Sequence, residues 1–281
     1  MKQTFKNIIH PTDYQKSGVS AFAHGLKLAI ATKGRFTILH NEQDEVEDEV
    51  RQGAFPGVRD TLATWGLLDL GAAPESVEEA VGVRVSKIDL AGNTTVGGVV
   101  SFIERHDADL VVLGTAARDG LPRWLKGSVA EQVAQKSGIA ALFLPHATKG
   151  FVDAKTGELN LSSVLVPVDQ YPSPAAALQA AVGLIELLDA QAAKLHILHV
   201  GSQETSPALD LPSWLAARTE RMTLQGPVVE TIVAAADQLD ADLIVMATEG
   251  RHGFLDALRG STTEAVLRRA HRPLLAVPAH G

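Results

Sequence analysis

Two aspartates follow apolar segments that have the composition of buried strands. Asp13 ends the segment Asn7–Asp13, and Asp169 ends the similar segment Ser163–Asp169. In doubly wound α/β proteins, ligands bind at the carboxyl ends of the strands, where such a carboxylate can accept a hydrogen bond from a ribose hydroxyl or a base amine. The same side chain can instead cap the next helix or order a turn. Both interpretations stay open for each aspartate.

Two loops of small residues are candidates for binding a phosphate. Each loop follows an apolar strand and precedes a helix, and its small residues have the same spacing in both. They are Gly114, Ala117, Gly127 and Ser128 in the first loop, and Ala247, Gly250, Gly260 and Ser261 in the second. Small side chains let a phosphate approach the backbone, and the free N–H groups and dipole of a helix start attract an anion. Two loops at one spacing are much stronger evidence than a single glycine pair.

The paired motifs belong to an internal repeat that runs through the chain. Equivalent residues lie 156 positions apart at Asp13, 159 apart at His40 and only 133 apart at Asp109. The second copy has therefore lost 26 residues between its second and fourth strands. A helix in this part of the second copy must be shortened or missing.

Each copy alternates five strands with helices. The predicted strands are short apolar runs rich in β-branched residues: Asn7–Pro11, Arg35–His40, Gly82–Ile88, Leu110–Gly114 and Ala140–Pro145 in copy one, and Ser163–Pro167, Lys194–Val200, Arg221–Leu224, Leu243–Ala247 and Leu274–Pro278 in copy two. The predicted helices are Ser17–Thr32, Thr95–Arg105, Ser128–Lys136, Ala175–Ala190 and Val228–Leu239. Because right-handed crossovers place helices on both faces of a sheet, this order predicts an α/β protein with two doubly wound, five-stranded parallel sheets.

The repeat also predicts the domain boundaries. The first domain covers residues 1–147, a linker covers 148–161, and the second, shortened domain covers 162–281. Asp153–Gly157 has turn chemistry, so we expect a small hairpin in the linker. Each copy ends on a short apolar strand, Ala141–Leu144 or Leu274–Val277, and an unprotected sheet edge is a liability. We therefore expect these two edges to meet, so that the copies pack as a pseudo-dimer.

The loop spacing resembles the G-x2-G-x9-G-[S/T] nucleotide loop of universal stress proteins. The Pro-x-Asp after strand one and the Leu-His of strand two are also similar to that family, and the resemblance covers both copies apart from the linker and the shortened part of copy two. It implies a Rossmann-like fold of the adenine nucleotide alpha hydrolase type, a role in the stress response, and binding of ATP or AMP, with Mg as a possible companion. The residues implied to lie at the nucleotide are Asp13, Asn41, Leu113, Gly114, Ala117, Gly127, Ser128 and Val129 in copy one, and Asp169, Val200, Met246, Ala247, Gly250, Arg251, Gly260, Ser261 and Thr262 in copy two.

Both loops depart from the family pattern at one glycine. Ala117 stands at the second glycine of copy one, and Ala247 stands at the first glycine of copy two. An alanine adds a methyl group where the ligand must approach and tolerates positive φ poorly. Two alternatives to nucleotide binding therefore stay open. One is a degenerate loop kept for packing, and the other is a site for a different small or apolar ligand in the space left by the missing segment of copy two.

Efficient catalysis is not expected from these residues. Phosphoryl transfer needs a positioned nucleophile and neutralisation of charge at the leaving phosphate. The sequence offers no Walker lysine, no arranged base and no clear pair of metal-binding carboxylates. We therefore expect a binding or adaptor protein, with slow ATP hydrolysis as the alternative.

The sequence does not predict a zinc site. His10 and His40 should lie near Asp13 at the carboxyl ends of adjacent strands, and two imidazoles with a carboxylate can hold zinc. Histidines at strand ends more commonly satisfy a local hydrogen bond.

Composition limits the partners. The chain has a net charge of −8 and no cysteine, so a general nucleic-acid binder and a disulfide scaffold are both disfavoured. The start of the chain has no signal-peptide core, and no apolar run approaches the roughly 18 residues of a membrane helix. The sequence therefore predicts a cytoplasmic protein with no membrane partner. A homodimer of the tandem chain is possible, and the sequence does not identify a protein partner.

Overall fold

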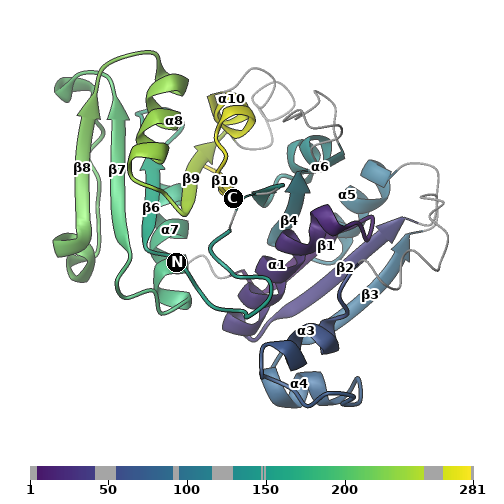
Figure 1. The fold of residues 1–281 in the computed structure, drawn as a ribbon. Coiled ribbons are helices and arrows are strands. Elements are labelled where there is room, and N and C mark those ends of the chain that lie inside the picture. Colours follow the sequence, from purple (N-terminus) through teal and green to yellow (C-terminus); the bar gives the residue numbers. More distant parts are fainter. Residues whose placement is uncertain are drawn as a thin grey trace.

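The ten strands of the protein form one continuous sheet. The computed structural model describes residues 5–41, 55–90, 95–115, 129–146, 148, 150–249 and 262–279. The strands are β1 (Asn7–Pro11), β2 (Arg35–Asn41), β3 (Arg84–Leu90), β4 (Leu110–Thr115), β5 (Ala140–Pro145), β6 (Ser163–Pro167), β7 (Lys194–Val200), β8 (Thr219–Leu224), β9 (Leu243–Thr248) and β10 (Leu274–Pro278). Their order in the sheet is β3-β2-β1-β4-β5-β10-β9-β6-β7-β8 (Figure 1).

The order of the strands is a mirror repeat about the centre of the sheet. Within each copy all neighbouring strands are parallel, and the first strand lies between the second and the fourth. The copies meet where β5 and β10 pair antiparallel, with Leu274 opposite Phe143 and Ala276 opposite Ala141. This arrangement confirms the doubly wound fold class, and the two terminal edges protect each other as expected.

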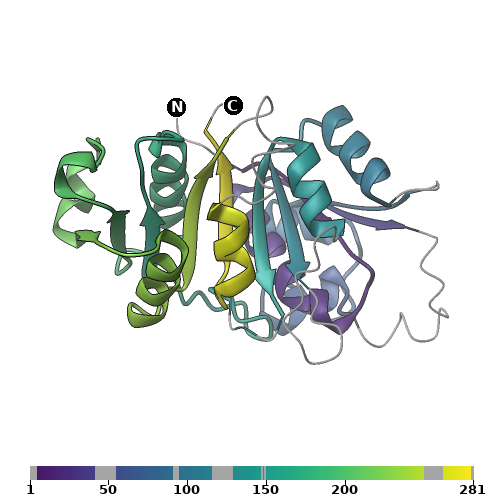
Figure 2. The same ribbon diagram turned by 90° about the horizontal axis from the view of Figure 1, so that it is seen from above.

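Helices cover both faces of the sheet (Figures 1 and 2). Helices α1, α3, α4 and α7 supply buried residues to the core on one face, and α5, α6, α8 and α10 supply them to the core on the other. The bounds are α1 (Val19–Thr32), α3 (Val58–Thr64), α4 (Ser76–Val81), α5 (Thr95–Arg105), α6 (Val129–Ser137), α7 (Ala175–Leu187), α8 (Val228–Gln238) and α10 (Thr262–Arg269). Each core contains residues of both copies, so the central strand pair joins two hydrophobic layers as well as two sheets.

Most predicted elements are found within a few residues of their expected bounds. The clearest shift is at β3, which begins at Arg84 although the strand was predicted from Gly82. Gly82 has φ 72° and caps the end of α4, a left-handed conformation that glycine adopts without a steric penalty. The predicted helix from Ser17 begins as a 3-10 turn, Lys16–Gly18, before α1.

The segment lost from copy two corresponds to helices α3 and α4 of copy one. These helices lie between β2 and β3, in the stretch 42–83. The corresponding stretch of copy two, 201–218, holds only two 3-10 turns, Gln203–Thr205 and Ser213–Arg218. The repeat offsets therefore located the missing helical region correctly.

The linker between the copies forms the expected small hairpin, which docks on copy one. Val152 pairs with Leu159 across it, and Trp65 donates a hydrogen bond from Nε1 to the carbonyl oxygen of Ala154, at 3.3 Å. At its turn, Gly157 has φ 70°, and a Cβ there would lie 2.5 Å from the Trp65 ring. Glycine is therefore required at this position both by the backbone and by the ring that it faces.

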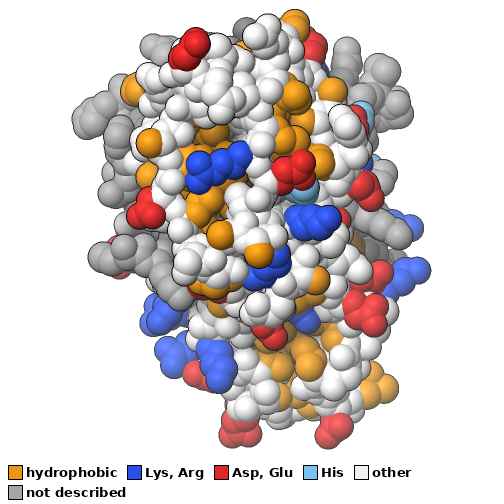
Figure 3. All heavy atoms as spheres, turned by 90° about the vertical axis from the view of Figure 1, so that its left-hand side faces the viewer, with side chains coloured by type: hydrophobic (Ala, Val, Ile, Leu, Met, Phe, Trp, Pro, Cys, Tyr) orange, Lys and Arg blue, Asp and Glu red, His pale blue; other side chains and the backbone are white. Residues whose placement is uncertain are grey.

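The surface shows charges of both signs. Figure 3 views the molecule from the side of β8, where blue and red side chains are interspersed with orange hydrophobic patches. The described part of this face therefore offers no continuous basic surface of the kind that nucleic acids need. No helix in the described ranges is both long enough and apolar enough to cross a membrane.

Candidate functional site

A cavity of about 330 Å³ lies at the carboxyl ends of β6, β7 and β9, beside the start of α10. Its walls include every predicted copy-two residue that the structure describes: Asp169, Val200, Met246, Ala247 and Thr262. These residues come from three strand ends and one helix start, which is where a parallel doubly wound sheet leaves a crevice. The fold thus brings together residues that are up to 93 positions apart in the chain.

The cavity offers apolar walls and a few polar groups. Met246 is buried and Val200 is half-buried, while Asp169 is exposed and accepts a hydrogen bond from the backbone N–H of Gln170 at 2.7 Å. The turn-ordering interpretation of this aspartate therefore holds, but one such bond leaves other lone pairs of the carboxylate available. Thr262 begins α10, whose first N–H groups have no partner within the helix.

Thr248 is a polar group of this cavity that the sequence did not single out. Thr248 is one of the residues around the cavity, and the residue is only 5% exposed. Among the described residues, no hydrogen-bond partner reaches its Oγ1. A buried hydroxyl without a partner costs free energy, so a ligand that supplies one would be stabilised here.

Tyr171 and Glu249 join two segments at the rim of the same cavity. Tyr171 follows β6 and Glu249 follows β9, and both line the cavity. The Tyr171 hydroxyl donates a hydrogen bond to the Glu249 carboxylate, and this bond raises the pKa of Tyr171 above its usual range. Tyr171 is also one of only two tyrosines in the chain and lies two residues after Asp169. Its position in the sequence was the signal that could have drawn attention to it.

The loop residues of copy two lie mostly outside the described residues. These are Gly250, Arg251, Gly260 and Ser261. Their predicted role in holding a phosphate stays a prediction.

The copy-one residues are placed at the equivalent strand ends. Asp13 follows β1 and accepts a hydrogen bond from the backbone N–H of Gln15, at 3.1 Å, so this carboxylate also orders a turn. Leu113 is buried, and a Cβ at Gly114 would lie 3.5 Å from the Cα of Gly18, an ordinary contact distance. The remaining predicted residues at described backbone positions are Asn41, which ends β2, and Val129, which begins α6. Ala117, Gly127 and Ser128 lie outside the described residues.

His10 and His40 each make a hydrogen bond to a nearby backbone carbonyl oxygen. Their Nδ1 atoms lie 3.0 Å from the carbonyl oxygens of Val112 and Thr12, respectively. A carbonyl can only accept, so each Nδ1 carries the hydrogen. Burial lowers the pKa of His10 to about 4, which keeps that ring neutral near pH 7. Among the described residues, no group of three or more side chains is placed to hold a metal ion.

A sequence model of the universal stress protein family matches residues 4–145 and 216–278. The chain belongs to this family. A relative from Mycobacterium tuberculosis, universal stress protein Rv2005c, is 28% identical over 242 residues, which cover 75% of this chain and 79% of the relative. Universal stress protein MJ0531 of Methanocaldococcus jannaschii is 27% identical over 146 residues, 52% of this chain and 85% of the relative.

The whole two-copy fold also resembles a solved universal stress protein. The crystal structure of that protein, from Archaeoglobus fulgidus, has a TM-score of 0.65 and 20% identity, and the match covers 98% of this chain and 99% of that chain. A putative universal stress protein from Pseudomonas aeruginosa gives a TM-score of 0.64 and 17% identity over 97% and 93% of the chains. At such low identity these likenesses support the fold alone.

Proposed function

We propose that this universal stress protein binds an adenine nucleotide in the cavity of copy two and acts as a binding or adaptor protein in the stress response. One observation carries the proposal: the five described residues that the sequence assigned to the copy-two nucleotide site all line one cavity. A volume of about 330 Å³ lies within the range of small-ligand sites, roughly 300–1,000 Å³.

The chemistry of the walls suits the parts of such a ligand. Val200 and Met246 supply apolar contacts for a base, and the Asp169 carboxylate can accept from a ribose hydroxyl or a base amine. The buried Thr248 hydroxyl offers a further bond. The start of α10 attracts a phosphate through its N–H groups and dipole.

The ionisable groups in the described lining of the cavity indicate whether it could support catalysis. Its ionisable groups are Asp169, Tyr171 and Glu249, with no lysine or arginine. Phosphate transfer needs positive groups around the leaving phosphate, so the described lining favours binding over turnover. The predicted role of Arg251 is to supply that charge from the loop.

Calorimetric titration with adenosine, AMP and ATP, with and without Mg, tests the proposal. We expect binding by the parent protein and at least about tenfold weaker binding by Asp169→Asn, because a hydrogen bond to a charged group is worth about 1.5–3 kcal/mol. Ala247→Leu should prevent binding by filling the cavity. Asp13→Asn is the matched variant in copy one, and it shows whether copy one contributes.

Thr248→Val separates ligand recognition from folding. Valine has nearly the same shape as threonine and lacks the hydroxyl, so the fold loses no hydrogen bond made within the described residues. We expect nucleotide affinity to fall about three- to tenfold, with the midpoint of thermal unfolding unchanged or raised. Equal affinity in Asp169→Asn, Ala247→Leu and Thr248→Val would place the ligand elsewhere. Release of ADP during the ATP titrations would favour the slow hydrolase instead.

A further inference from the structure

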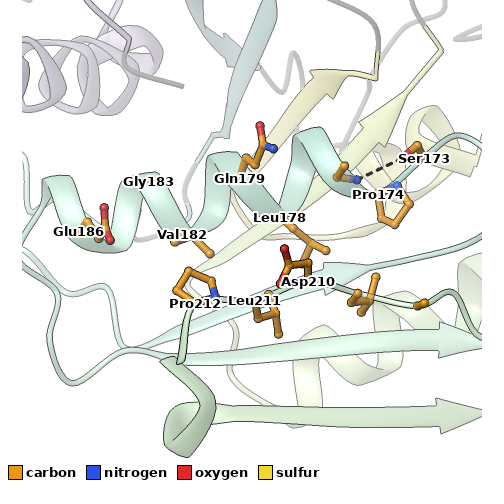
Figure 4. A pocket seen from close by; sticks show the side chains of 13 residues that line it. Ser173, Pro174, Leu178, Gln179, Val182, Gly183, Glu186, Asp210, Leu211 and Pro212 are labelled. Atoms are coloured by element: carbon orange, nitrogen blue, oxygen red, sulfur yellow. Dashed lines mark hydrogen bonds between the residues drawn. The ribbon is translucent and has the colours of Figure 1, made fainter. Parts of the chain in front are cut away.

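A second and larger cavity lies on the outer side of α7. Its volume is about 520 Å³, and it separates the helix from the segment 208–212 (Figure 4). It shares only Pro174 with the described lining of the nucleotide cavity. The two spaces are therefore neighbours with different walls.

The equivalent face of copy one is closed by protein. The repeat offset of 156 positions pairs Leu178 with Phe22 and Val182 with Leu26. Phe22 is 1% exposed and Leu26 is fully buried, in a core that also holds Leu62 of α3. In copy one the ring of Phe55, just before α3, lies 5.1 Å from that of Phe22, whereas copy two has no counterpart of α3 and its helix faces a cavity.

The walls of the cavity are apolar on two sides. Figure 4 shows Leu178 and Val182 extending from α7 toward the opposite segment, where Pro212 lies across from Val182. Leu209 and Leu211 complete this apolar surface. An apolar body can therefore be held between helix and segment.

The polar groups around this surface are acidic or neutral. Glu186 stands on α7 and Asp210 on the opposite segment, where Figure 4 shows the Asp210 side chain directed toward the helix. None of the lining residues that the structure describes is a lysine, an arginine or a histidine. In copy one the equivalent helix face carries Lys27, whose Nζ lies 5.7 Å from the Trp65 ring centre, and Gly183 stands at that position in copy two. Loss of the covering helix is thus accompanied by loss of the lysine and gain of a carboxylate, since Glu186 replaces Ile30.

We propose that this cavity binds an amphipathic organic cation, an amine with an apolar ring or chain. The apolar body lies between α7 and the segment 208–212, and the ammonium group meets the Asp210 carboxylate, while Glu186 adds negative charge further along the helix. Ligand cavities combine an apolar lining with a few placed polar groups in this way, and about 520 Å³ is within their usual range. The inference does not depend on nucleotide binding.

Three probes of one shape and different charge test the ligand class. They are 1-naphthylmethylamine, 1-naphthalenemethanol and 1-naphthaleneacetate, titrated into the full chain by calorimetry near pH 7. We expect a Kd below about 1 mM for the amine, with the alcohol at least about tenfold weaker and the acetate weaker still. The double variant Glu186→Gln/Asp210→Asn should weaken the amine about tenfold and bring it close to the alcohol.

A matched pair of variants at Gly183 tests the location. Gly183→Lys restores the residue type of copy one, fills the groove and supplies an internal cation, so amine binding should be lost. Gly183→Ala gives a similar gain in helix propensity without the charge, and it should keep the amine Kd within about threefold of the parent. Thermal unfolding of both variants checks that the fold is retained.

Several results would overturn the proposal. They are no amine binding at about 1 mM, equal affinity for alcohol and amine, or amine binding that survives Gly183→Lys. Loss of amine binding in Asp169→Asn would move the amine into the nucleotide cavity. A dimer that forms in the parent and dissociates in Gly183→Lys would show that a second copy of the chain covers this face.

Discussion

Helices α1 and α7 occupy equivalent places in the two copies, yet their outer faces have opposite surroundings. The hairpin of the linker and the α3 region cover α1, and the buried residues Phe151 and Leu62 belong to that cover. The outer face of α7 has a cavity of about 520 Å³ instead. Since the same type of helix packs on the same type of sheet in both copies, the difference arises from two segments that cover α1: the α3 region between β2 and β3, and the linker hairpin.

The residues of the two faces have diverged together with their surroundings. His24 of α1 is fully buried and holds the linker hairpin, since its Nε2 accepts a hydrogen bond from the backbone N–H of Val152 at 3.1 Å. Its equivalent in α7 is Ala180, which can make no such bond. The side chains of α7 thus lack a group like His24 that could hold a covering hairpin, and the outer face of this helix borders a cavity.

The largest expected effect tests this difference by truncating equivalent side chains. Leu26→Ala opens a cavity in a sealed core and should cost about 2–5 kcal/mol of unfolding free energy. Val182→Ala removes less from a half-buried position beside an existing cavity, so we expect a loss below about 1 kcal/mol. Urea unfolding of the two variants measures both values. Equal losses would mean that the α7 face is as tightly packed as that of α1.

The second effect concerns pH and the docked hairpin. Burial lowers the pKa of His24 to about 4 from its usual value of 6.5. Between these two values the unfolded chain binds a proton that the folded chain does not, so the free energy of unfolding falls as the pH drops from about 6.5 to about 4. The contribution is present in full above pH 6.5 and amounts to at most about 3 kcal/mol.

The variant His24→Phe should remove this contribution to the pH dependence. It should be less stable than the parent at pH 7, because the Val152 N–H loses its acceptor, but it should lose less stability on acidification. His10, whose pKa burial also lowers to about 4, keeps a similar contribution in both proteins. Urea unfolding at pH 7 and pH 4.5 gives the comparison, and an unchanged acid response in His24→Phe would contradict it. NMR titration of the ring measures its pKa directly.

The repeat made most of the fold predictable. Apolar, β-branched runs such as Leu110–Thr115 and Leu243–Thr248 identify buried parallel strands, and the change in repeat offset locates the missing helices. The meeting of β5 and β10 was expected because each copy ends on an apolar edge, and the structure shows that they pair antiparallel. The docking of the hairpin was not predicted, because it depends on contacts such as His24 with Val152 that lie 128 positions apart.

The candidate site was predictable where the residue types carry a local signal. Asp169 and Ala247 were found from motifs at strand ends, and both line the copy-two cavity. Thr248 and Tyr171 were missed, since a threonine at the end of a strand and a tyrosine in a loop are common and only the assembled walls give them a role. The second cavity also needed the structure, because no single motif describes the space between a helix and a distant segment.

A swap at equivalent strand ends gives the third expected effect. Gly114 of β4 corresponds to Ala247 of β9, 133 positions later. Ala247→Gly removes a methyl group from the cavity wall and should raise nucleotide affinity about five- to tenfold, or roughly 1 kcal/mol. Gly114→Ala places a Cβ 3.5 Å from its nearest neighbours, an ordinary contact, so the fold should persist. If it leaves total nucleotide binding unchanged while Ala247→Gly raises it, binding resides in copy two. The reverse pattern would assign it to copy one.

The smallest effect concerns the histidines one residue before the ends of the second strands, β2 and β7. His40 and His199 both place Nδ1 against a backbone carbonyl oxygen, that of Thr12 at 3.0 Å and that of Val168 at 3.1 Å. They differ at Nε2. In copy two it lies 2.8 Å from the Thr205 hydroxyl, whereas no described residue reaches the Nε2 of His40.

Thr205→Val should therefore lower the stability of copy two alone, and only slightly. The Thr205 hydroxyl has one hydrogen, which can be donated either to the Nε2 of His199 or to the carbonyl oxygen of Ser202, 2.9 Å away, and valine removes this donor from both. Thr205 is exposed, so water can reach the freed lone pair and the cost should be about 0.5 kcal/mol, or roughly 1 °C in the unfolding midpoint. Thr205→Ser keeps the hydroxyl and serves as the control. His199 immediately precedes Val200, which lines the copy-two cavity. A fall in nucleotide affinity in Thr205→Val but not in Thr205→Ser would show that this bond also positions the cavity wall. A loss of several kcal/mol of stability would mean that the short segment replacing α3 and α4 is held mainly through His199.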